Sequence, residues 1–258
     1  MPITPTVEPS RAPLRRGVVL VVIAALLSLA AAGGPASARQ NAPDHSDLHA
    51  AYNAALLDSA VYRFSNLRPL KPLQFDPATK TVQVVQLTDF RGYTVGENAL
   101  QREVWVTAVP EVQERCQGFS ADLEMRLRQL LGLPPYQRLA HFVVMTVKQG
   151  DIFRPAADSD PTTTLPCACP VTADCGKTFP KSAPDAHRQW YAGEMLGRYF
   201  IVEGPSERFG YPWTRLGYTY DWKPGADKYG ASEYVVRKGA TVRVTEIIPY
   251  PRYCGFPE

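Results

Sequence analysis

The chain has 258 residues, of which 45% are hydrophobic and 21% are charged, and its formal net charge is +3. This composition suits a folded protein with one sizeable core, or at most two small ones. The near balance of charges provides no electrostatic footprint for nucleic acid or for an anionic membrane surface, so we expect neither partner.

The first 38 residues have the pattern of a secretory signal peptide. Three arginines precede an apolar run over 17–32, and Ala36 and Ala38 form the small-residue pattern of a cleavage site. A membrane anchor is the alternative, but the run is shorter than the roughly 20 residues that a spanning helix needs. We therefore expect a secreted or periplasmic mature chain, residues 39–258, with no stable membrane insertion after cleavage.

Helical and strand patterns alternate along the mature chain. Apolar residues spaced by three and four predict helices over 47–59, 120–131 and 185–199, the second with Ser120 as its N-cap. Runs rich in β-branched residues predict strands over 60–64, 80–87, 102–109 and 141–147. Two more strands within 231–248, with Lys238 and Gly239 between them, have the pattern of a hairpin.

This mixture of elements, with a β-rich end, predicts an α+β fold with a mostly antiparallel sheet and a few helices. We expect a single exported domain over 39–258 that disulfides stabilise. One long irregular stretch, 154–184, holds six prolines and three cysteines. Loops of this length are usually functional or held in place, and the cysteines favour the second role.

All cysteines lie in the mature part of the chain, where export makes disulfides the default. Their number is odd, so at least one is left outside an intrachain pair. We expect Cys254 to be bonded, because the C-terminal tail has little else to hold it, with Cys116 or a member of the 167–175 cluster as its partner. The disulfide candidates are Cys116, Cys167, Cys169, Cys175 and Cys254.

Metal binding is the alternative for two of these patterns. Short cysteine spacing suits zinc or copper(I), and His45 and His49 have the i, i+4 spacing of two ligands on one helix face. No histidine lies near the cysteine cluster, and the histidine pair lies close to the expected N-terminus, where chains fray. We therefore predict no metal site.

The C-terminal third holds most of the aromatic residues, and the segment 210–222 is the richest in them. A strand over 211–222 would place Trp213, Arg215, Gly217, Thr219 and Asp221 on one face, and Leu216, Tyr218, Tyr220 and Trp222 on a buried face. The first face is either exposed, with an Arg–Asp pair, or a ligand-binding face. For the second case we expect Tyr211 or Trp213 to stack on the ligand, and Arg215 and Asp221 to contact it.

Glu233 opens the segment SEYVVRKGATVRV, in which a glutamate precedes a β-branched strand, a glycine turn and a second strand. This segment resembles the catalytic-glutamate strand of ADP-ribosyltransferase-like folds, and Arg63 in VYRFS resembles the arginine with which that family contacts its dinucleotide. The resemblance implies that Glu233 is catalytic and that NAD is the substrate. Ala231 stands where the family has the first glutamate of an E-x-E motif, so we expect NAD hydrolysis or another transfer rather than transfer to a protein arginine.

A non-catalytic exported domain, with an aromatic face that binds a glycan or a protein partner, is the alternative function. An enzyme should bring Glu233, an arginine and an aromatic ring into one concave pocket, with Arg63 or Arg215 binding phosphate. If Glu233 is buried, it needs a partner, for which Arg63, Arg215 and Tyr218 are the candidates. A binding module should leave Glu233 in solvent at the rim of a flat surface.

Overall fold

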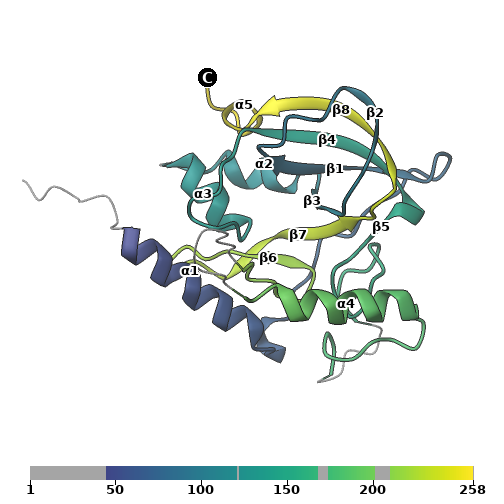
Figure 1. The fold of residues 1–258 in the computed structure, drawn as a ribbon, viewed down its shortest axis with the longest axis horizontal. Coiled ribbons are helices and arrows are strands. Elements are labelled where there is room, and N and C mark those ends of the chain that lie inside the picture. Colours follow the sequence, from purple (N-terminus) through teal and green to yellow (C-terminus); the bar gives the residue numbers. More distant parts are fainter. Residues whose placement is uncertain (1–44, 121, 168–173, 201–209, 258) are drawn as a thin grey trace, which may run out of the picture. The chain divides into compact units, whose positions relative to one another are not determined.

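A computed structural model of the protein describes residues 45–120, 122–167, 174–200 and 210–257 (Figure 1). The expected signal peptide and Cys169 lie outside these ranges. Within them, no helix combines the length and the apolar character that crossing a membrane requires.

The described residues form five α-helices, of which the two longest lie close to their expected positions. Tyr52 and Leu56, four residues apart on the first helix, are fully buried, as the apolar spacing predicts. The helices are α1 (His45–Ala60), α2 (Glu111–Cys116), α3 (Leu123–Leu130), α4 (Asp185–Gly197) and α5 (Tyr250–Tyr253). The short helices α2 and α5 were not predicted.

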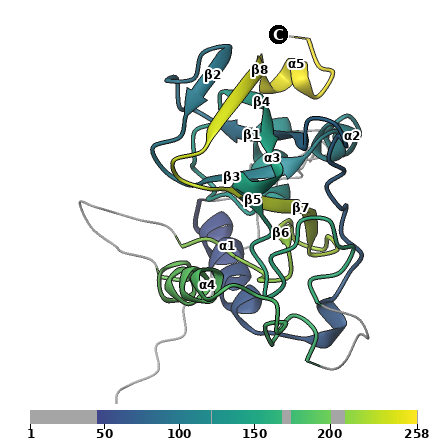
Figure 2. The ribbon, with the colours of Figure 1, turned by 90° about the vertical axis from the view of Figure 1, so that its right-hand side faces the viewer.

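A single antiparallel sheet of eight strands confirms the predicted fold class (Figures 1 and 2). The strands are β1 (Thr81–Thr88), β2 (Gly96–Ala99), β3 (Val104–Ala108), β4 (His141–Lys148), β5 (Ile152–Phe153), β6 (Tyr218–Tyr220), β7 (Tyr229–Val236) and β8 (Thr241–Pro249). Their order is β2-β8-β4-β1-β3-β7-β5, and β6 pairs with the edge of β7. The strands predicted over 80–87, 102–109 and 141–147 correspond to β1, β3 and β4.

The predicted hairpin within 231–248 is wrong. Both strands exist, but β7 pairs with β3, β5 and β6, whereas β8 pairs with β2 and β4. The short connection between them pairs with another segment, because Leu100 exchanges backbone hydrogen bonds with Gly239 and Ala240 on it. A local turn signal was present, but the partners of each strand come from distant parts of the chain.

Each face of the sheet has its own apolar core, because successive side chains of a strand point to opposite faces. Val84, Val106 and Tyr234 belong to one core. Val85 and Ala231 belong to the other, which α2, α3 and α5 cover. Helix α1 packs Tyr52 and Leu56 against Tyr220 and Trp222, beside β6. Figure 2 shows α1 and α4 on the β6 side of the sheet.

Two disulfides are present in the described residues. Cys116, the last residue of α2, is bonded to Cys254, which follows α5, with an S–S distance of 2.06 Å. This bond confirms the prediction for Cys254. Cys167 is bonded to Cys175, which confirms the disulfide interpretation of the short-spaced cysteines.

Two local predictions around the helices are wrong. Residues 60–64 form no strand: α1 continues to Ala60, and a short 3-10 helix, η1 (Phe64–Asn66), follows. Val61 and Phe64 are more than half exposed, so the apolar run has no sheet to pack on. The N-cap of α3 is Asp122, whose Oδ1 accepts the Met125 N–H at 3.1 Å, rather than Ser120.

The segment 211–222 is not a continuous strand either. The chain reverses within it, so that Trp213 forms an antiparallel bridge with Thr219, and only Tyr218–Tyr220 belongs to a strand. Arg215 and Gly217 adopt left-handed backbone conformations, with φ of 61° and 82°. Of the two alternatives for the first face, the exposed one is wrong, since Trp213, Thr219 and Asp221 are each at most 9% exposed.

Candidate functional site

Glu233 lies in β7, directly opposite Thr107 of β3. Its N–H donates to the Gly217 carbonyl at 3.0 Å, on the opposite edge of the strand from β3. Trp105, two residues before Thr107, lies on the same face of the sheet, about 7 Å along the strand. The sheet therefore places a carboxyl and an indole side by side on one surface.

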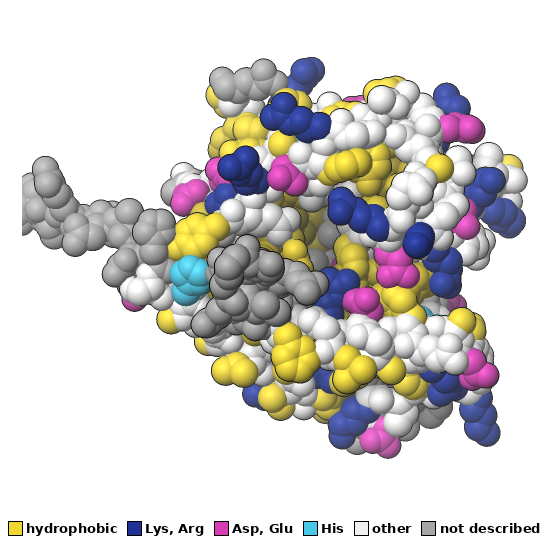
Figure 3. All heavy atoms as spheres, in the orientation of Figure 1, with side chains coloured by type: hydrophobic (Ala, Val, Ile, Leu, Met, Phe, Trp, Pro, Cys, Tyr) yellow, Lys and Arg dark blue, Asp and Glu magenta, His cyan; other side chains and the backbone are white. Residues whose placement is uncertain are grey.

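This surface belongs to one wall of a pocket of about 480 Å³. Figure 3 shows the molecule hollowed above α4, where basic and acidic side chains meet. Strands β1, β3 and β7 contribute one wall, and the loop after α3 and the segment 211–213 contribute the other. The lining includes the charged residues Asp89, Arg102, Glu103, Arg198 and Glu233 and the aromatic residues Trp105, Tyr211, Trp213 and Tyr220.

Glu233 is 6% exposed, and its Oε1 has no hydrogen-bond partner among the described residues. Burial without such a partner raises the pKa of Glu233 to about 8, against an opposing effect of the Arg198 charge. None of the partners expected from the sequence fulfils that role: Tyr218 donates to the Asn66 carbonyl instead. Glu233 thus places a buried carboxyl with an unused hydrogen-bonding atom on the lining of the pocket.

Arg198 follows α4 and is the cation whose charge acts on Glu233. Its guanidinium lies 4.4 Å from the centre of the Trp105 ring and 5.6 Å from that of Tyr211. An ion pair with Glu194, one helical turn earlier, also holds it. The two cation–π contacts and the ion pair through Nε together fix the position of the guanidinium in the pocket.

The rest of the pocket wall is tied to α4 through Trp190. Glu103 accepts the Trp190 Nε1–H at 2.7 Å. The Trp190 ring lies 6.2 Å from Trp105 and 6.0 Å from Trp213, measured between ring centroids. Arg102 is exposed at the rim, with its guanidinium 5.4 Å from the Phe90 ring centre.

The structure brings together only some of the residues predicted for the site. Tyr211, Trp213 and Glu233 line the pocket. Arg63 does not, and instead forms an exposed ion pair with Asp58 at 2.9 Å. Arg215 does not either, because its Nη2 donates to the Ala60 carbonyl at 2.6 Å.

Asp221 is also not part of this pocket. It is buried against Arg126 of α3, whose Nη1 donates to Oδ1 at 3.0 Å. The predicted Arg215–Asp221 pairing does not occur, since each residue has another partner. Asp221 thus fastens α3 to the segment after β6.

Arg198 and Trp105 are the important pocket residues that sequence reasoning missed. Trp105 lies in a strand that was predicted, but nothing local indicated which face would meet Glu233. Arg198 comes at the end of a predicted helix, where a basic residue is ordinary. Their role depends on contacts between segments that lie far apart in the chain.

The described part of the chain contains no group of three or more His, Cys, Asp or Glu side chains that could hold a metal ion. The ring of His49 lies 5.0 Å from that of Tyr136, as a packing contact. Comparison with known proteins gave no match: no family model, curated protein or solved structure is significantly similar to the chain. The chemistry of the pocket is therefore the basis for assigning a function.

Proposed function

We propose that the protein is an exported enzyme that cleaves the nicotinamide–ribose bond of NAD, as an NAD glycohydrolase or an ADP-ribosyltransferase-like enzyme. The observation that carries the proposal is the buried Glu233 carboxyl, which faces a pocket with its Oε1 unbonded and Arg198 nearby. Export would suit the disulfides, which persist in oxidising compartments.

In the proposed reaction, the bond between ribose C1′ and the nicotinamide nitrogen breaks, and its electron pair leaves with nicotinamide. Positive charge develops on the ribose, and the Glu233 carboxylate stabilises it while accepting a hydrogen bond from the ribose 2′-hydroxyl. Water adds to C1′ and loses a proton, which gives ADP-ribose, nicotinamide and H⁺. Another nucleophile in place of water gives ADP-ribosyl transfer.

The neighbours of Glu233 suit the rest of this substrate. A guanidinium binds phosphate oxygens through paired N–H donors, and Arg198 and Arg102 both line the pocket, so they are the candidates to bind the diphosphate group. Tyr211, which is 37% exposed, provides ring surface for a flat base. These two arginines replace Arg63 and Arg215 in the role that the sequence suggested.

The same geometry disfavours a glycan-binding module. Such a module needs rings whose faces are open on a flat surface, but Trp105, Trp190 and Trp213 pack against one another. Glu233 is buried inside a concavity, whereas a binding module should leave it in solvent at the rim.

The test is release of nicotinamide and ADP-ribose from NAD by the purified protein. We expect kcat/KM of the wild type to rise with pH through about 8, because the reactive form of Glu233 is the carboxylate. Glu233→Gln, which keeps size and shape, should abolish turnover. Arg198→Gln should raise KM and move the pH dependence upward, since the Arg198 charge lowers the pKa of Glu233.

Glu246→Gln is the matched control, because Glu246 is an exposed glutamate on β8 outside the pocket. It should leave the rate unchanged. Full activity of Glu233→Gln, or no release of nicotinamide by the wild type at any pH, would contradict the proposal. Tight NAD binding without turnover would favour a binding protein instead.

A further inference from the structure

Glu233 is held in place from both edges of β7. On one edge its own N–H donates to Gly217, as described above. Successive N–H groups of a strand point to opposite edges, so the Ser232 N–H points toward β3. The register of β3 with β7 ends at the Thr107–Glu233 pair, which leaves Ser232 one residue beyond the last pair.

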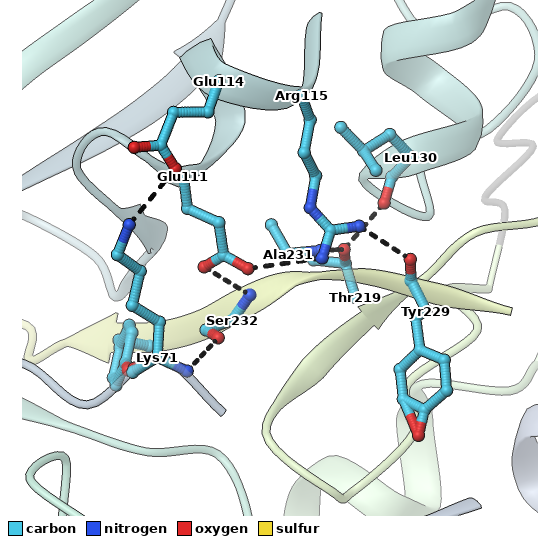
Figure 4. A network of polar contacts seen from close by, with 10 residues as sticks. Lys71, Glu111, Glu114, Arg115, Leu130, Thr219, Tyr229, Ala231 and Ser232 are labelled. Atoms are coloured by element: carbon cyan, nitrogen blue, oxygen red, sulfur yellow. Dashed lines mark hydrogen bonds and ion pairs between the residues drawn. The ribbon is translucent and has the colours of Figure 1, made fainter. Parts of the chain in front are cut away.

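A side chain from α2 occupies the position of the missing strand partner (Figure 4). Glu111, the first residue of α2, accepts the Ser232 N–H with its Oε2 at 3.0 Å. The Lys71 N–H donates to the Ser232 hydroxyl at 2.8 Å. Ser232 is 3% exposed, so water does not supply a substitute for either bond.

Glu111 itself is fixed by basic neighbours. The Arg115 guanidinium lies 3.5 Å from its Oε1 and also donates to the Tyr229 carbonyl at 3.0 Å, so α2 contacts β7 at two points (Figure 4). Burial raises the pKa of Glu111, while the hydrogen bond from Ser232 and the charges of Arg115 and Lys71 lower it. The Glu111 side chain is only 12% exposed, so its carboxyl is buried beneath the helix rather than part of an ordinary surface ion pair.

We propose that Glu111 is a positioning residue for Glu233: through the Ser232 N–H it fixes the backbone from which the Glu233 carboxyl enters the pocket. The role in turnover rests on the proposed function. Without Glu111, the Ser232 N–H is buried and unpaired, so β7 must shift to find an acceptor. A displacement of about 1 Å at a catalytic group lowers the rate by about 10²-fold.

The experiment compares substitutions of Glu111 with a control on the same helix. Glu111→Ala should lower kcat by about 10²-fold with little change in KM. Glu111→Gln keeps an oxygen that reaches Ser232, so it should retain most of the turnover. Glu111→Asp keeps the charge but is one methylene shorter, so it should resemble Glu111→Ala. Glu114→Ala, an exposed neighbour with only an ion pair to Lys71, should leave kcat unchanged.

A second readout does not depend on NAD: the titration of the Glu233 carboxyl followed by NMR. In Glu111→Ala and Glu111→Asp, its pKa should move from its raised value toward the ordinary range, because the carboxyl leaves its buried position. If the wild type releases no nicotinamide, the proposed function fails, and this titration alone decides the positioning role.

Several outcomes would overturn the proposal. One is a loss of stability in Glu111→Ala with kcat and the pKa of Glu233 both unchanged, which would make Glu111 merely structural. If Glu111→Ala does not fold, the other two substitutions decide. Equal kcat and equal Glu233 titration in Glu111→Asp and Glu111→Gln would refute a role for the hydrogen bond to Ser232.

Discussion

Glu233 has an unusual protonation state for a glutamate side chain. With a pKa of about 8, it carries a proton at neutral pH in the protein alone. A ligand with positive charge, such as the nicotinamide ring, would favour the ionised form. Binding of NAD would thus be coupled to release of a proton from the pocket.

The same group makes stability depend on pH. In the unfolded chain the pKa of Glu233 returns to about 4.5, so between about pH 5 and pH 8 the folded protein binds more protons than the unfolded one. The free energy of unfolding should therefore fall as pH rises across this range, by up to about 1.4 kcal/mol per pH unit from this group. Glu233→Gln stays neutral and should lack this contribution.

Urea unfolding of both proteins at several pH values measures the difference, and other titrating groups cancel in it. Glu233→Gln should become more stable relative to the wild type as pH rises from 5 to 8, with the effect complete above about 8. Parallel curves would mean that Glu233 has the same pKa in the folded and unfolded chains.

Residues of the site were predictable where one segment carried the signal. Glu233 at the start of a β-branched run, and Tyr211 and Trp213 in an aromatic segment, were found in this way. Arg63 and Arg215 are not pocket residues, because the partner of an arginine is the acceptor that the fold places nearest to it, and the sequence alone does not show which one that is. For Arg215 that acceptor is a carbonyl at the end of α1.

Among the elements, long periodic ones were predictable and short ones were not. α1, α4, β1 and β4 each repeat their pattern over at least eight residues, which is enough to define a buried face. β5 has two residues and α5 has four. Elements this short form only because neighbouring parts of the fold pack against them. The false hairpin shows the same limit, since strand pairing is decided by the whole sheet.

The turn before β6 depends on Gly217. With φ of 82°, this position is unfavourable for any residue with a Cβ, and an added Cβ would lie 2.7 Å from the Arg154 side chain and 2.9 Å from Leu70. The groups that approach Gly217 closely are therefore side chains of the protein and not a ligand. Gly217→Ala should lower the free energy of unfolding by about 2–4 kcal/mol, from strain and overpacking together.

Thermal or urea unfolding checks this value, with Gly150→Ala as the control, because Gly150 has nothing within 4 Å of an added Cβ. Since the Gly217 carbonyl accepts the Glu233 N–H, turnover should fall as well. A Gly217→Ala protein as stable as the Gly150→Ala protein would show that the turn has another accessible conformation.

At the scale of the whole described chain, the two disulfides differ greatly in the length of the loop that each one closes. Cys116 and Cys254 are 138 residues apart, whereas Cys167 and Cys175 are 8 apart. In the chain-entropy model, the longer loop contributes more to stability. Replacing both Cys116 and Cys254 by alanine should therefore lower the free energy of unfolding by about 3–5 kcal/mol.

The alanine pair at Cys167 and Cys175 should lose less, about 2–3 kcal/mol, because its loop is short. Urea unfolding of the two double variants under identical conditions measures both losses. The reverse order would mean that local packing around the 154–184 stretch outweighs chain entropy.

The longer disulfide also turns most of the molecule into a covalent ring. Arg198, Trp213 and Glu233 all lie between Cys116 and Cys254, so a protease that cuts one peptide bond in this span opens the ring and releases nothing. The two new ends stay joined through sulfur, and the non-covalent contacts of the pocket can keep them in place. A nicked molecule would then remain one particle, with Arg198 and Glu233 still lining the same pocket.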